Sequence, residues 1–166
     1  MKAKLIVNGK EFPIEINDPK LIEEITSKKK TGYECQPGGH YWHSTARNCV
    51  ESAYDGCCVF DNDCYEFANY YSNETVAQNN TRADALMRRL RRFAVEHREM
   101  KIDGEDDSAK YCIYYINNDN IISVTWYETY QPFGLIYFDS KATAELAIEE
   151  FKDELIWYFT VYKDSL

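Results

Sequence analysis

Apolar and polar residues alternate in two short stretches near the N-terminus, over residues 4–7 and 12–16. Between them stands Asn8-Gly9, a pair typical of a tight β-hairpin turn, because both turn positions need a positive φ. Asp18-Pro19 then marks a helix start, since aspartate caps free backbone N–H groups and proline fits the first helical turn. We therefore expect residues 1–31 to form a module of one β-hairpin and one short helix.

The clearest alternation lies further along, over residues 111–116 and 121–127, on either side of a polar turn at 117–120. Apolar residues at every second position of the second arm predict a hairpin with one buried face. A further strand is predicted over 134–138. The helical spacing of apolar residues then predicts a helix over 141–159.

Residues 32–100 carry a weaker version of the same order. Strand-like pieces at 40–44, 49–53 and 65–71 precede a predicted helix over 74–97, in which apolar residues recur at helical spacing.

An internal similarity links the two parts. The segment NYYSNETVA (69–77) aligns with IYFDSKATA (136–144), matching two aromatic positions, a helix-capping position and an alanine. The expected fold is therefore α+β, with an antiparallel sheet and helices on one face. It is built from two ββ(β)α repeats (32–100 and 101–166) within one domain over 32–166, plus the N-terminal hairpin and helix. Whether the N-terminal module is independent stays open.

Composition and charge narrow the class of protein. Hydrophobic residues are 45% and aromatic residues 15% of the 166 positions, which excludes a disordered tail or a coiled coil. No apolar run approaches the length of a membrane span, and the first residues lack the apolar core of a secretion signal, so we expect a cytoplasmic protein with no membrane partner. The net charge of −9 suits binding to basic surfaces, or simply keeps the protein soluble.

Five of the six cysteines fall between residues 35 and 64, together with His40 and His43. These residues leave a zinc site open as one alternative, yet the paired Cys-x2-Cys spacing typical of such sites is missing. No phosphate-binding glycine loop, nucleophile elbow or metalloprotease motif occurs. We therefore expect no enzyme activity, no cofactor and no catalytic residue, with a metal-dependent enzyme at the Cys/His cluster as a remaining alternative.

Two charged groups are candidate binding sites. The second long helix carries carboxylates that could mimic a row of phosphates, and an acidic loop over 101–109 precedes the second hairpin. We assign partner binding to Glu145, Glu149, Glu150, Asp153, Glu154, Asp103, Glu105, Asp106 and Asp107. The first long helix carries an arginine cluster suited to phosphates. The alternative nucleic-acid site is Arg82, Arg88, Arg89, Arg91 and Arg92. A further interpretation is that these arginines pair internally, with the acidic loop or with the second helix.

Three stretches, KLIVNGKEFPIEI, KKKTGYE and IYFDSKATAELAIEEFKDELIWYFTVYKDSL, resemble small acidic accessory proteins encoded by phages and prophages of Gram-positive bacteria. The resemblance covers residues 1–34 and roughly 64–166, and its motifs are structural, so it transfers no active-site residue. It implies a protein that acts against host defence by binding, as anti-CRISPR proteins do, in the cytoplasm of the bacterial host. The expected partner is a CRISPR–Cas effector, bound through an acidic, tyrosine-rich surface. The alternative is a nucleic-acid-binding accessory protein that uses the arginine-rich helix.

Overall fold

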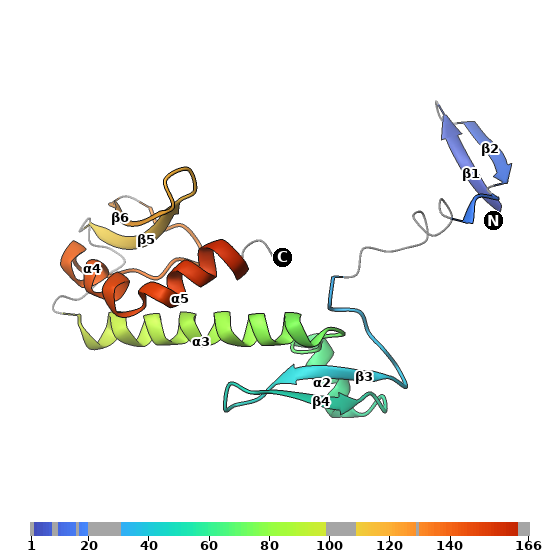
Figure 1. Cartoon of the computed structure of the whole chain (residues 1–166), viewed down its shortest axis with the longest axis horizontal. Helices are drawn as coiled ribbons and strands as arrows, with labels where there is room; N and C mark the ends of the chain where they lie inside the picture. Colours follow the sequence, from blue (N-terminus) through green and yellow to red (C-terminus); the bar gives the residue numbers. More distant parts are fainter. Residues whose placement is uncertain are drawn as a thin grey trace.

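The computed structural model describes residues 2–7, 10–15, 17–19, 31–98, 109–128 and 130–162. The chain has an α+β fold, in which the described strands form two-stranded antiparallel sheets and helices pack against the sheets β3–β4 and β5–β6 (Figure 1). No helix in the described part of the chain is long and apolar enough to cross a membrane.

The predicted N-terminal hairpin is confirmed. Strands β1 (Lys2–Val7) and β2 (Lys10–Glu15) pair antiparallel, with Val7 opposite Lys10 at the turn. The helix predicted after it falls almost entirely on residues 20–30, which lie outside the described residues.

The next part of the chain contains β3 (His40–Ser44), β4 (Val50–Tyr54), α2 (Val59–Glu66) and α3 (Glu74–Glu96). The strand-like piece expected over 65–71 is wrong: its start belongs to α2, and the Trp42 and Tyr71 backbones form an isolated bridge. Helix α2 was not predicted, because only Asp61 and Cys64 in it are buried and its sequence therefore shows no apolar stripe. Helix α3 begins after Asn73, whose side chain accepts a hydrogen bond from the Val76 N–H, 3.1 Å away.

The last part contains β5 (Lys110–Ile116), β6 (Ile121–Tyr127), α4 (Lys141–Glu150), α5 (Lys152–Trp157) and a π-helical turn, η1 (Tyr158–Tyr162). The predicted hairpin is confirmed, whereas the strand expected over 134–138 is reduced to one bridge between Tyr111 and Phe138. Ser140 caps α4 by accepting a hydrogen bond from the Thr143 N–H. The single helix expected over 141–159 is interrupted at Phe151, whose φ of −106° and ψ of 18° are not helical.

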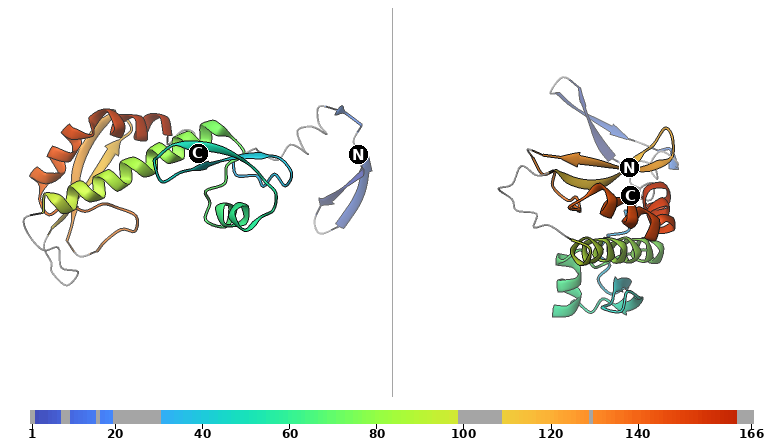
Figure 2. Two further views of the ribbon diagram at one scale, coloured as in Figure 1. Left: turned by 90° about the horizontal axis from the view of Figure 1, so that it is seen from below. Right: turned by 90° about the vertical axis from the view of Figure 1, so that its left-hand side faces the viewer.

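The expectation of one shared sheet is wrong: β3–β4 and β5–β6 are separate sheets. They lie on opposite sides of a helical layer, with β3–β4 against α3 and β5–β6 against α4 (Figures 1 and 2). The physical reason is that both helices carry apolar side chains toward each other, so they pack together and keep the hairpins apart.

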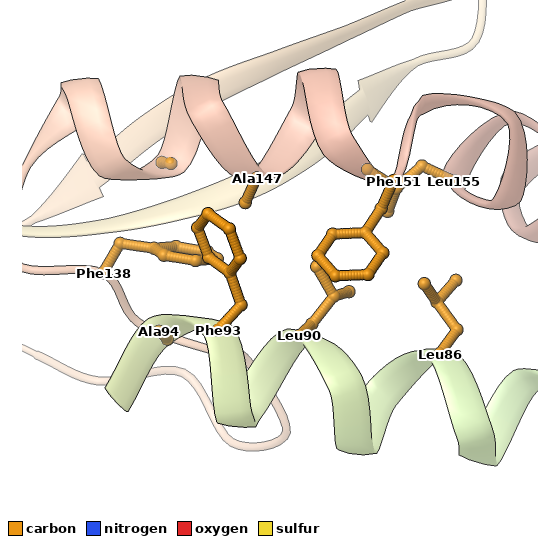
Figure 3. Packing of buried hydrophobic residues seen from close by; sticks show 9 residues of the cluster. Leu86, Leu90, Phe93, Ala94, Phe138, Ala147, Phe151 and Leu155 are labelled. Atoms are coloured by element: carbon orange, nitrogen blue, oxygen red, sulfur yellow. The ribbon is translucent and has the colours of Figure 1, made fainter. Parts of the chain in front are cut away.

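The main hydrophobic core fills this helix interface. Leu86, Leu90 and Phe93 of α3 point toward Phe151 and Leu155 of the C-terminal helices (Figure 3). Phe93 and Phe151 meet edge to face, with ring centroids 5.8 Å apart. A second, smaller core of Tyr41, Cys64 and Tyr70 lies between the β3–β4 hairpin and α2.

Candidate functional site

Helices α4 and α5 place most of the predicted acidic residues on their solvent side. Ala144, Ala147, Phe151 and Leu155 are at most 4% exposed and fix which side faces the core. The carboxylates between them therefore point outward. We use the name acidic face for the four that are exposed: Glu145, Glu149, Glu150 and Asp153.

Glu154 differs from these four because it is paired inside the molecule. Its Oε2 lies 2.7 Å from Nη1 of Arg89, and the side chain is only partly exposed. The guanidinium of Arg89 also lies 4.8 Å from the ring centroid of Phe151. These two interactions hold Arg89 against the C-terminal helices. Because Glu154 is paired in this way, we do not count it as part of the acidic face.

Three residues of the acidic face line an open depression of about 430 Å³ at the turn between α4 and α5. Its rim carries Glu149, Glu150 and Asp153, with Lys152 and the Arg89–Glu154 pair beside them. At the other end of α4, Lys141 Nζ lies 3.3 Å from Glu145 Oε1. That pair is exposed and one turn apart, so it contributes little to stability and leaves Glu145 free to exchange partners. The remaining predicted acidic residues, Asp103, Glu105, Asp106 and Asp107, lie outside the described residues.

The arginines of α3 are largely engaged by neighbouring side chains. The guanidinium of Arg82 stacks 3.9 Å above the ring of Trp157, Arg88 donates a hydrogen bond to Asn48, and Arg92 pairs with Glu96 one turn on. The expected pairing with the second helix is confirmed at Arg89. Within the residues described, Arg91 alone among the five candidates has no such contact.

The Cys/His region does not assemble a metal site. Within the ranges that the structure covers, no three histidine, cysteine, aspartate or glutamate side chains come together as ligands. His40 and His43 instead pack edge-on against the rings of Tyr54 and Phe60. The zinc hypothesis therefore has no support in the described geometry.

The same region holds a buried polar network that the sequence did not indicate. Asp55 and Asp61 are each 4% exposed. One carboxylate oxygen of Asp55 accepts a hydrogen bond from the Tyr70 hydroxyl at 2.9 Å, and Asp61 accepts one from the Tyr41 hydroxyl at 2.9 Å. The two phenol rings stack with centroids 4.1 Å apart, so the carboxylates and phenols form one unit.

Backbone donors complete this network. Asp61 also accepts from the N–H groups of Gly56 and Cys58, at 3.0 Å each, and closes a capping box at the start of α2. Hydrogen bonds from Cys58 hold the pKa of Asp61 below its ordinary value, while burial raises the pKa values of Tyr41 and Tyr70 above theirs. Asp61 at the third helical position could have indicated a capping box. The motif was not recognised because cysteine, and not the usual serine or threonine, occupies the cap position.

A second carboxylate is held at the start of α3. Glu34 accepts hydrogen bonds from the Ser72 hydroxyl and from the Thr31 and Gly32 N–H groups. The hydrogen bonds from Ser72 and then from Thr31 lower the pKa of Glu34 to about 2. Both carboxylate systems are satisfied by donors within the chain, so they stabilise the fold and are not available to a partner, unlike the exposed carboxylates of the acidic face.

Comparison of the chain with protein-family models, with curated proteins and with solved structures finds no match in any of the three.

Proposed function

We propose that this protein acts by stoichiometric binding of a basic macromolecular partner through its acidic face, without catalysis. The observation that carries the proposal is the group of exposed carboxylates, Glu149, Glu150 and Asp153, around the open depression between α4 and α5. The chain's net charge of −9 adds a long-range attraction toward basic surfaces.

The spacing of these charges supports mimicry of a nucleic-acid backbone. Glu145 and Glu149 are one helical turn apart, about 6 Å along the axis, and Asp153 follows beyond the interruption of the helix at Phe151. Such a row of negative charges fits a channel lined with lysine and arginine. Together with the resemblance to phage accessory proteins, this favours the nucleic-acid channel of a CRISPR–Cas effector, in the host cytoplasm, as the partner surface.

The fold itself supports a duplicated unit. The Trp42–Tyr71 and Tyr111–Phe138 bridges each join a hairpin to the residue two positions before a helix cap. Alanines follow at equivalent helix positions, Ala77 and Ala144, and both are fully buried. We infer that the two parts are copies of one ββ(β)α unit, packed helix to helix, and that the acidic face is specific to the second copy.

The experiment titrates the protein into DNA-cleavage reactions of purified Cas effectors from Gram-positive bacteria, at several salt concentrations. We expect inhibition that is complete near one protein per effector and weakens as salt rises, because exposed charges are screened. The test variant replaces Glu149, Glu150 and Asp153 by lysine. A matched control makes the same charge change on other exposed acidic residues: Glu51, Asp63 and Glu66.

The proposal predicts that the test variant loses inhibition at least tenfold more than the control, with both variants folded by circular dichroism. Equal losses in the two variants would mean that only net charge matters and would refute the acidic face. If no effector is inhibited by the parent protein, the anti-CRISPR version is wrong.

The nucleic-acid-binding alternative has a different signature. It predicts that the parent protein shifts RNA or DNA in a gel at low salt and that Arg91→Ala with Arg92→Ala removes the shift. The engagement of Arg82, Arg88 and Arg89 by neighbouring side chains weighs against it.

A further inference from the structure

A cavity of about 200 Å³ lies against the main core, where Phe138 forms part of its lining. Helix α3 contributes Leu86, Met87 and Leu90 to its wall, and Leu155 closes it from the C-terminal helices. Figure 3 shows Leu86 and Leu90 pointing toward Leu155 across this part of the interface. The cavity is thus built by elements far apart in the sequence.

The side chains that line the cavity are apolar except at one point. Apart from the Gly134 backbone, every lining residue has an aliphatic or aromatic side chain, and Tyr158 is the single one with a polar group. An apolar cavity of this kind is poorly filled by water, because a buried water molecule needs two or more polar partners. It suits an apolar guest that makes at most one hydrogen bond.

One wall of the cavity is irregular and reaches the surface. The segment 134–136 supplies Gly134, Leu135 and Ile136, with Gly134 at a φ of +85° and Leu135 38% exposed. The start of η1 also lines the cavity, and π-helical turns occur frequently at functional sites. The cavity therefore has a mouth at which a small molecule can enter without unfolding the core.

Another part of the wall is held firmly. Phe159 stacks on Tyr115 of β5, with ring centroids 5.2 Å apart and planes 4° from parallel. Tyr158 meets Phe159 edge-on at 5.4 Å, which fixes the tyrosine at the lining. Tyr158 and Phe159 therefore present aromatic rings in a fixed arrangement to a ligand bound in the cavity.

Size and chemistry together select the ligand class. Ligand pockets for drug-sized molecules and cofactors run from about 300 to 1,000 Å³, so this cavity is too small for a nucleotide or a flavin. A cavity of about 150 Å³ lined by aliphatic and aromatic side chains is enough to bind benzene. We propose that this cavity binds a one- or two-ring aromatic molecule carrying at most one polar group, as a ligand site separate from the acidic face.

The experiment uses the full chain with ¹³C-labelled isoleucine and leucine methyl groups, titrated with toluene and with indole. We expect saturable shifts of the Ile113 and Leu155 methyl resonances and a rise in the unfolding temperature. Benzoate serves as the charged analogue and is expected to cause neither effect, because the cavity offers no counter-charge.

Two variants test the location. Met87→Phe adds a ring to the cavity wall and is expected to weaken toluene and indole binding at least tenfold, whereas Ile156→Phe, at an exposed position outside the lining, keeps it. Leu135→Trp, which narrows the mouth, replaces Met87→Phe if that variant does not fold. Absence of saturable shifts in the parent protein, shifts confined to methyl groups outside the cavity, or undiminished binding by a folded cavity variant would each overturn the proposal.

Discussion

Phe133 and Phe138 lie five positions apart on one short segment, yet the structure gives them opposite environments. Phe138 is 1% exposed and belongs to the main core, while Phe133 is fully exposed. Replacing each by alanine therefore makes the same chemical change in two settings. We expect Phe138→Ala to destabilise the protein strongly and Phe133→Ala to leave stability within about 0.5 kcal/mol of the parent.

The magnitude for Phe138→Ala follows from its burial. A buried phenylalanine removes about 150–250 Å² from water, which at about 25 cal/mol per Å² corresponds to about 4–6 kcal/mol. The methyl group that remains and some relaxation of neighbours reduce this value, and phenylalanine-to-alanine changes in cores cost about 3–5 kcal/mol. We therefore expect a loss of about 4 kcal/mol in the free energy of unfolding. For a chain of this length that is a fall of about 8–16 °C in the unfolding temperature.

Equilibrium unfolding in urea, followed by circular dichroism, measures both variants against the parent protein. The change in midpoint, multiplied by a shared slope, gives the free-energy difference. A loss below 1 kcal/mol for Phe138→Ala, or similar losses for both variants, would refute the placement of Phe138 in the core.

Three further changes have defined outcomes. Asn73→Ala and Ser140→Ala each remove a helix cap, so urea unfolding should show a loss of about 1 kcal/mol for either; no loss at either site would contradict the assigned caps. Gly32→Ala should lower the unfolding temperature, because φ is +85° and the added Cβ would lie 2.7 Å from a valine side chain of α3; an unchanged temperature would contradict this close approach. The raised pKa values of Tyr41 and Tyr70 mean that stability present below pH 10 is lost as the pH rises above 10, when the unfolded chain ionises first. Urea midpoints between pH 8 and 11 measure this, and replacing both tyrosines by phenylalanine should flatten the decline.

The candidate site was predicted in part. Alternation of apolar and charged positions places Glu145, Glu149 and Glu150 on the outer side of a helix, and they are exposed. Pairing of the arginines with the second helix was one interpretation of the sequence, but nothing in it singled out Arg89 and Glu154, because that pair depends on how the two helices pack. The cavity could not be predicted from the sequence either, because its walls come from four separate segments.

Local periodicity by itself determined which segments become hairpins and long helices and which side of each is apolar. It did not determine what covers that side. The sequence suggested one sheet because two similar hairpins precede two similar helices, but the helices pack on each other and keep the sheets apart. Burial of Asp55 and Asp61 was likewise decided only in the tertiary structure, where distant tyrosine hydroxyls supply the hydrogen bonds that make a buried carboxylate tolerable. Secondary structure follows from neighbours along the chain, whereas burial follows from neighbours in space.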